Sequence, residues 1–240
     1  MSQRHSIHDF SKIAILGSSR GFGASLYNEL SHYENKEFLL VSRKIEQQGV
    51  ELQNELQYRE VQLSIDLKNK NNKVLFNCDF SKLENCQLLK SKIIEFKPDI
   101  IFYIAGGGPY GRFEDKKWAD HLWAYNVNLL FPAQLYHELL ALKKLNLITT
   151  KIIIFIGSDI ADNKPDPLSA SYSSAKHGLR GLINSIQYEQ PLIESYLYSP
   201  GYMDTKLLPP NATPRHQTPD LVVKPEHEVK KLIKSIFNNC

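Results

Sequence analysis

The stretch that decides the fold is Lys12-Ile13-Ala14-Ile15-Leu16-Gly17-Ser18-Ser19-Arg20-Gly21-Phe22-Gly23. Its apolar start predicts a short buried parallel strand, and a helical pattern follows over residues 24–31. Glycines spaced as G-x-x-x-G-x-G let the backbone approach a pyrophosphate, and the helix N-terminus offers N–H groups and a positive dipole. We therefore expect a dinucleotide site here, with an ordinary glycine-rich turn as the alternative. Its expected residues are Gly17, Ser19, Arg20, Gly21, Phe22 and Gly23.

Apolar runs and helical patterns alternate along the rest of the chain. Strands are predicted over 37–41, 73–77, 99–104, 151–156 and 195–199, and helices over 45–67, 81–96, 113–145, 172–189 and 225–237. We expect Pro132 to kink the longest helix, 66–72 to be a loop and 202–224 to be a mobile loop over the site. The alternation predicts an α/β fold with a Rossmann-like doubly wound parallel sheet, in a single domain over residues 1–240.

Composition narrows the class of protein. The 240 residues are 42% hydrophobic and 23% charged, with a net charge of +3, which suits a globular domain and is too mild to indicate nucleic acid. There is no apolar run of membrane-spanning length and no signal-peptide core in residues 1–10. Three cysteines, an odd number with no zinc spacing, and scattered histidines predict reduced thiols, a cytoplasmic location and no metal site.

The end of the second predicted strand bears on the choice of cofactor. An acidic residue is typical there when the ribose of NAD is bound. Ser42 and Arg43 follow this strand instead, and Arg20 lies in the glycine turn. Because a guanidinium can bind a 2′-phosphate that a carboxylate would repel, NADP(H) is expected over NAD(H). A pair of solvated surface cations is the alternative.

A second motif is Ala170-Ser171-Tyr172-Ser173-Ser174-Ala175-Lys176. Small residues without Gly or Pro from Ser171 to Lys176 favour a closely packed helix, on which positions i and i+4 share a face. A nearby ammonium favours the phenolate, so Lys176 is expected to lower the pKa of Tyr172 and fit it for proton transfer. A packed tyrosine beside a solvated lysine is the alternative, because this spacing is common in helices.

Taken in order, these motifs resemble the classical short-chain dehydrogenase/reductase family from about residue 12 to residue 237. The resemblance implies a catalytic tetrad of Asn128, Ser158, Tyr172 and Lys176. It also implies further cofactor contacts from Tyr172 and Lys176 and from Asp79, Ala105, Gly106, Gly107, Pro200, Gly201 and Thr205. By the same resemblance, Asn128 positions Lys176 through a water relay and Lys176 also holds the nicotinamide ribose.

Four departures from the family pattern stand out. Leu16 occupies the place of the usual Thr, and Tyr103-Ile104 replaces the usual Asn-Asn. The segment between the second and third strands is long. Ser158 lies one residue further from Tyr172 than is common, and Asp159 is closer to the usual spacing. Ser158 remains the expected catalytic residue, because a hydroxyl can donate to a carbonyl oxygen and an ionised carboxylate only accepts.

The resemblance implies an NADPH-dependent oxidoreductase that transfers hydride between the cofactor and a ketone, aldehyde or secondary alcohol, as a homodimer or homotetramer. Tyr110, Trp123, Tyr202 and the 202–224 loop are expected to line the substrate pocket, although an aromatic stripe such as that of Trp123 also fits a core or an interface. One rival is a non-catalytic NADP-binding sensor on the same fold. A second is an epimerase or dehydratase, whose usual substrate domain this chain is too short to hold.

Overall fold

The computed structural model describes residues 5–43, 61–64, 72–159 and 167–237. Their strands form one seven-stranded sheet in the order β3-β4-β2-β1-β5-β6-β7. The strands are β1 Lys12–Leu16, β2 Glu37–Ser42, β3 Val61–Ser64, β4 Asn72–Asn77, β5 Ile100–Tyr103, β6 Ile152–Ile156 and β7 Glu194–Tyr198. All neighbours run parallel except β3, which pairs antiparallel with β4 at one edge.

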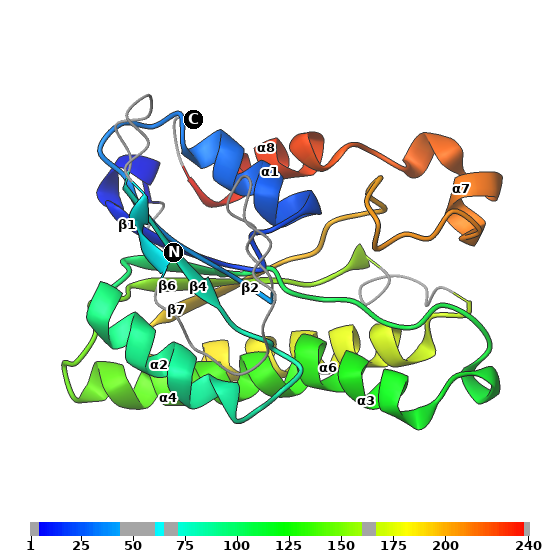
Figure 1. Cartoon of the computed structure of the whole chain (residues 1–240), viewed down its shortest axis with the longest axis horizontal. Helices are drawn as coiled ribbons and strands as arrows, with labels where there is room; N and C mark the ends of the chain where they lie inside the picture. The colour runs from blue at the N-terminus through cyan, green and yellow to red at the C-terminus, as the bar shows by residue number, and fades with distance from the viewer. Residues whose placement is uncertain (1–4, 44–60, 65–71, 160–166, 238–240) are drawn as a thin grey trace.

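Helices cover both faces of the sheet (Figure 1). On one face lie α1 Gly21–Leu30 and α8 Pro225–Ile236, and on the other lie α2 Asn85–Phe96, α3 Trp118–Tyr125, α4 Phe131–Lys144 and α6 Ala170–Tyr188. A short α7, Thr213–Gln217, lies in the segment between β7 and α8. The described residues also contain three 3-10 turns: Ile7–Asp9, Phe113–Asp115 and Pro219–Leu221.

The strands read as nearly continuous apolar runs because both faces of the sheet are covered. In β6, for example, all five residues of Ile152–Ile156 are buried. Alternate side chains enter two separate cores, one beneath α2, α4 and α6 and the other beneath α1 and α8. Without β3, the sheet order is that of a doubly wound fold, so the chain changes direction between β1 and β5 and leaves a crevice at their carboxyl ends.

The long helix expected over residues 113–145 is interrupted. A π-helical turn, Asn126–Leu130, separates α3 from α4, and Pro132 lies in the first turn of α4. Proline tolerates that position because its missing N–H is not needed at the start of a helix. The interruption therefore begins before Pro132, in the turn that contains Asn128.

Two other segments differ from expectation. Val61–Ser64 is a strand, whereas the sequence predicted a helix over 45–67. This segment pairs with the open edge of β4, which a local sequence pattern cannot reveal. Residues 44–60 and 65–71, which the same prediction covers in part, lie outside the described residues. The segment 202–224, expected to be a loop without regular structure, contains α7 and a 3-10 turn.

Within the described ranges, none of the helices combines the length and the apolar character that crossing a bilayer requires. The same residues contain no group of three or more His, Cys, Asp or Glu side chains arranged to hold a metal ion.

Candidate active site

A cleft of about 1500 Å³ opens at the carboxyl ends of the strands. Most of the residues predicted for the cofactor line it: Gly17, Ser19, Arg20, Gly21, Phe22, Gly23, Ser42, Arg43, Asp79, Ala105, Gly106, Tyr172, Lys176, Pro200 and Thr205. Gly201 lines a smaller neighbouring pocket instead. Gly107 is absent from the lining of both, since its backbone is bonded to Asn128. Residues from six separated segments thus meet where ligands of open α/β sheets bind.

The glycine turn packs too closely for side chains at two positions. Gly17 has φ +105°, and a Cβ there would lie 2.5 Å from the backbone N of Ala105. A Cβ on Gly23 would collide with the carbonyl oxygen of Gly17. The turn is therefore tight enough to bring the first N–H groups of α1 to the floor of the cleft, which fits the diphosphate of a dinucleotide.

Cationic side chains gather at the end of the cleft beside β2, where the resemblance to the family places the adenosine of a cofactor, and we call this the adenosine end. Arg20 and Arg43 are exposed, while Ser42 is buried with 4% of its surface accessible. The guanidinium of Arg43 lies over the indole of Trp123, 5.5 Å from the ring centroid. Such a cation–π contact holds the charge in one place without neutralising it. This arrangement fits a phosphate on the ribose of the cofactor.

Tyr172 and Lys176 line the other end of the cleft, and Tyr172 also lines the smaller pocket together with Ser158. Tyr172 and Lys176 lie on α6, with the lysine Nζ 5.7 Å from the centroid of the phenol ring. Ser158 comes two residues after the end of β6. Asp159, the alternative to Ser158, lines neither cavity, and its backbone N–H donates to the carbonyl of Pro200 at 3.0 Å. The geometry thus brings together the tyrosine, lysine and serine that the sequence analysis singled out.

Burial controls the charges of these groups. Lys176 is 2% exposed and donates from Nζ to the carbonyl of Ile156 at 2.6 Å. Desolvation lowers the pKa of Lys176 to about 7. Desolvation also raises the pKa of Tyr172, and the nearby Ser158 side chain offsets part of that rise. The expected lowering of the tyrosine pKa by Lys176 is therefore absent here, because removing both groups from water outweighs their mutual attraction.

Asn128 is fully buried, and both the NH₂ group and the oxygen of its side-chain amide are hydrogen-bonded to backbone groups. Its Nδ2 donates to the carbonyls of Gly107 and Ala124, both at 2.6 Å, and its Oδ1 accepts from the Gly107 N–H at 3.2 Å. The side chain thereby fastens the glycine-rich turn after β5 to the helix pair below it. A Cβ on Gly106 would meet both Asn128 Oδ1, at 2.8 Å, and Lys176 Nζ, at 3.5 Å, so the two polar groups approach each other beside Gly106.

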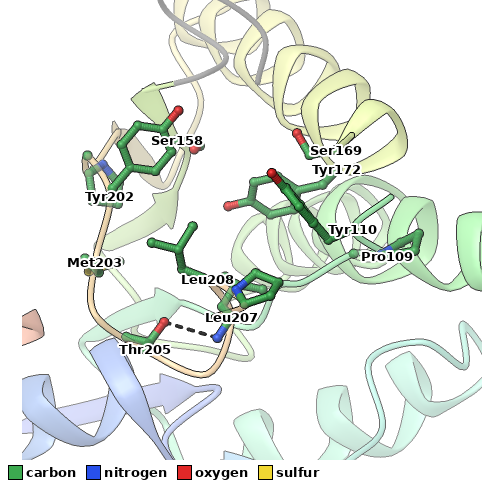
Figure 2. Close-up of a pocket in the computed structure, with 14 residues that line it drawn as sticks. Pro109, Tyr110, Ser158, Ser169, Tyr172, Tyr202, Met203, Thr205, Leu207 and Leu208 are labelled. Carbon is green, nitrogen blue, oxygen red and sulfur yellow. Dashed lines mark hydrogen bonds between the residues drawn. The ribbon is translucent and has the colours of Figure 1, made fainter. Parts of the chain in front are cut away.

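A smaller pocket of about 90 Å³ adjoins the catalytic end (Figure 2). The Tyr172 hydroxyl points into it, and Ser158 lies on the far side from Tyr110. The rest of its wall comes largely from the segment 202–209 and is apolar or aromatic except for Ser169 and Thr205. Tyr110 and Tyr202 line this pocket as expected, whereas Trp123 lines the larger cleft. None of the residues that line the small pocket carries a charged side chain.

The segment 202–224 crosses the mouth of both cavities and is held together from within. Arg215 of α7 forms an ion pair with Asp204 at 2.8 Å and donates to the carbonyls of Thr205, Leu208 and Pro209. The Tyr110 hydroxyl anchors the start of α7, accepting from the Thr213 N–H at 3.0 Å. Thr205 also lies against the first glycine turn, since a Cβ on Gly21 would touch its methyl group at 3.3 Å.

Sequence analysis missed several residues of the cleft. Phe80, Ile104, Val127 and Ile156 add apolar wall, and Arg215 reaches in from α7. Phe80 and Ile104 had a detectable signal, since each adjoins a residue that was predicted. Arg215 had none, because its role depends on how the segment 202–224 folds back on itself.

Comparisons with known proteins agree with this geometry. The model of the short chain dehydrogenase family matches residues 11–215. A curated relative, the dehydrogenase/reductase SDR family protein 7-like of Dictyostelium discoideum, is 26% identical over 197 residues, or 81% of this chain; the match spans only 59% of that protein's length.

Solved structures share the fold. An alcohol dehydrogenase from the archaeon Thermococcus sibiricus, solved with 5-hydroxy-NADP, is 21% identical with a TM-score of 0.69, covering 94% of this chain and 89% of that one. BdcA, solved with NADPH, is 17% identical with a TM-score of 0.69, covering 95% and 87%. These similarities concern the fold, and the family match covers the glycine turn, Asn128, Ser158, Tyr172 and Lys176 alike. The chain belongs to the short-chain dehydrogenase family, a family of oxidoreductase enzymes.

Proposed function

We propose that this protein is an NADPH-dependent carbonyl reductase, acting in reverse as an alcohol dehydrogenase. One observation carries the proposal. The hydroxyl of Tyr172, which shares the small pocket with Ser158, lies where the larger cleft joins that pocket, with Lys176 buried beside it. A substrate carbonyl in the small pocket would therefore meet a proton donor on one side and the nicotinamide end of the cleft on the other.

The roles of the residues follow from their chemistry. When bound, the cofactor supplies the hydride that adds to the carbonyl carbon. Ser158 donates a hydrogen bond to the carbonyl oxygen and stabilises the negative charge that develops on it. Tyr172 transfers its phenolic proton to that oxygen and takes it back in the oxidation direction. Lys176 orients the nicotinamide ribose and replenishes the proton, and Asn128 keeps the turn above Lys176 in place.

The wall of the small pocket supports a compact, uncharged substrate. Its volume of about 90 Å³ has room for roughly six to nine water molecules by the same measure. Because none of its lining residues is charged, a carboxylate or phosphate on the substrate would lose its hydration without gaining a partner. Small aliphatic or aromatic ketones and aldehydes fit this environment best.

Support for NADP over NAD comes from Arg20, Arg43 and Ser42 at the adenosine end. The archaeal alcohol dehydrogenase and BdcA, both solved with NADP-type cofactors, are consistent with the same choice. A cytoplasmic location is supported by Cys78 and Cys86, which are both free and buried within the described residues.

We also propose that the protein is a homodimer or homotetramer. Large apolar side chains are exposed on and near α3, with Trp118 at 64% and Leu122 at 44%. A surface of this kind on the helix next to α6 fits contact with a second copy of the chain. Light scattering at micromolar concentration measures the mass, and a monomer would contradict this part of the proposal.

The activity is tested by following NADPH absorbance with a panel of carbonyl compounds. Matched pairs such as acetophenone and 4-carboxyacetophenone separate the effect of charge from that of shape. We expect turnover of the neutral member with a kcat/KM at least about tenfold higher, corresponding to ~1.4 kcal/mol of transition-state binding. NADPH binding without turnover of any carbonyl would favour a sensor role, and preferred turnover of the carboxylate would overturn the proposed substrate class.

A further inference from the structure

The π turn beneath the active site leaves one backbone carbonyl without a helical partner. The N–H of Phe131 donates to the carbonyl of Asn126, five residues back, in place of the usual fourth residue. In that register the carbonyl of Val127 would accept from residue 132. Residue 132 is proline and has no N–H. In an α-helix the Val127 carbonyl would accept from the N–H of Phe131, but that N–H is bonded to Asn126. Neither the α-helical donor nor the π-helical donor is therefore available to Val127.

Tyr103 supplies the missing donor. Its hydroxyl donates to the Val127 carbonyl at 2.8 Å, from the last residue of β5. The tyrosine is 1% exposed, and burial raises its pKa well above the usual value, so the donor proton is retained. A buried carbonyl without a hydrogen-bond partner destabilises the folded state. The hydrogen bond from Tyr103 removes that penalty and so stabilises the π register at this place.

The π turn in turn places Asn128, which follows Val127 directly. The Asn128 side chain holds both the N–H and the carbonyl of Gly107, and its Oδ1 lies beside Gly106 in the approach to Lys176 Nζ. A return of the turn to the ordinary α-helical register would rotate residue 128 by about 100° about the helix axis. The bonds to Gly107 would then break, and the glycine-rich turn that lines the cleft would lose its anchor.

We propose that Tyr103 is a positioning residue for the reaction: its hydroxyl holds the π turn so that Asn128 stays fastened to the Gly106–Gly107 turn beside Lys176. This inference rests on the proposed reductase function for its kinetic consequence, but its structural part does not depend on any activity.

The chain offers a matched control for the test. Tyr136 of α4 is fully buried, and its hydroxyl likewise donates to a backbone carbonyl, that of Ile193, at 2.8 Å. It lines neither of the two cavities. Tyr103→Phe and Tyr136→Phe each remove one oxygen atom and leave one buried carbonyl unpaired. We expect both to lower Tm by a similar amount, about 2–4 °C for a chain of this length.

Only Tyr103→Phe should change the reaction. We expect kcat to fall about ten- to a hundredfold, as for a small displacement of catalytic groups, with KM for NADPH within about twofold of wild type. Hydrogen exchange followed by mass spectrometry tests the structural part without any substrate. The amide of Gly107, which donates to Asn128 Oδ1, should exchange faster in Tyr103→Phe and at the wild-type rate in Tyr136→Phe.

The outcomes separate the two proposals. Faster exchange at Gly107 in a protein that reduces no carbonyl would support the role of Tyr103 and refute the proposed function. Equal exchange and equal kcat in the two tyrosine variants would overturn the role of Tyr103 whatever the activity of the wild type. Exchange can be measured at low temperature if Tyr103→Phe is too unstable for kinetics.

Discussion

The two ends of the proposed cofactor cleft differ in how far their polar groups are exposed to water. At the catalytic end the polar groups are buried, with Asn128 0% and Lys176 2% exposed, and both are bonded to backbone groups. At the adenosine end Arg20 and Arg43 are exposed to solvent, and Arg43 lies over Trp123. Both ends belong to one cavity, yet only the first is withdrawn from water.

The difference in burial predicts how each end responds to its surroundings. Charges out of water change their pKa, as Lys176 does, and small displacements alter their energies strongly. Charges in water are screened by salt over about 10 Å at 0.1 M ionic strength. Chemistry at the catalytic end should therefore depend on pH and on single atoms, while cofactor choice should depend on net charge and ionic strength.

The largest effect is expected from Tyr172→Phe, which removes the proton donor and keeps the ring. The rate of carbonyl reduction should fall by about 10²–10⁴, the usual contribution of a general acid. The affinity for NADPH, measured by fluorescence titration, should change by less than about twofold. Tyr188→Phe is the matched control, since Tyr188 is on the same helix and 90% exposed. Substantial turnover by Tyr172→Phe would remove this tyrosine from the mechanism.

Next in size is the effect of Arg43→Asp on cofactor choice. Charge-assisted hydrogen bonds contribute about 1.5–3 kcal/mol each when well formed, so wild type should prefer NADPH by about ten- to a thousandfold. Arg43→Asp places a negative charge by the phosphate and should abolish or reverse that preference. Isothermal titration calorimetry with NADPH and with NADH measures this preference. The matched control is Lys234→Asp on α8, which makes the same change of charge outside the cleft. Equal affinities for NADPH and NADH in wild type would show that Arg43 does not select the cofactor.

A smaller effect concerns stability and pH at the catalytic end. The pKa of Lys176 is about 7 in the folded state and near 10.5 when unfolded, so between these values the unfolded state binds more protons. Stability of the wild type therefore rises with pH across this window, and below about pH 7 the cost of burying the charge is present in full. The difference in Tm, Lys176→Met minus wild type, should fall between pH 7 and pH 9. Lys234→Met, at an exposed position, should give a difference that does not vary, and the same flat result for Lys176→Met would contradict the lowered pKa.

The smallest effect concerns ionic strength, which should act on one end of the cleft and not on the other and which is tested on the wild-type protein. Raising ionic strength from 50 to 200 mM should weaken NADPH binding by several-fold, because the exposed contacts of Arg20 and Arg43 with a 2′-phosphate are screened. NADH lacks that phosphate, so its affinity should fall less. The rate constant for reduction at saturating NADPH should stay nearly unchanged. A salt dependence that is the same for both cofactors would place the selective contact away from these arginines.

Much of this protein was determined by local sequence. The strand at Lys12–Leu16 and the glycine turn after it were predictable because an apolar run and close glycines allow few other conformations. The helical spacing of Tyr172 and Lys176 was predictable because residues four apart on a helix share a face. Parallel strands carry their carboxyl ends to one edge, so most of the residues that line the cleft were expected to lie together before any packing was known.

Only the tertiary structure decided the remaining features, because each depends on groups distant in sequence. The pKa values of Lys176 and Tyr172 follow from how completely other segments exclude water from them, so the sequence-based expectation of a lowered tyrosine pKa was wrong. The contact of Arg43 with Trp123 and the hydrogen bond of Tyr103 to Val127 join elements that no local pattern relates. The strand at Val61–Ser64 likewise exists because β4 offers an edge to pair with, which is a property of the assembled sheet.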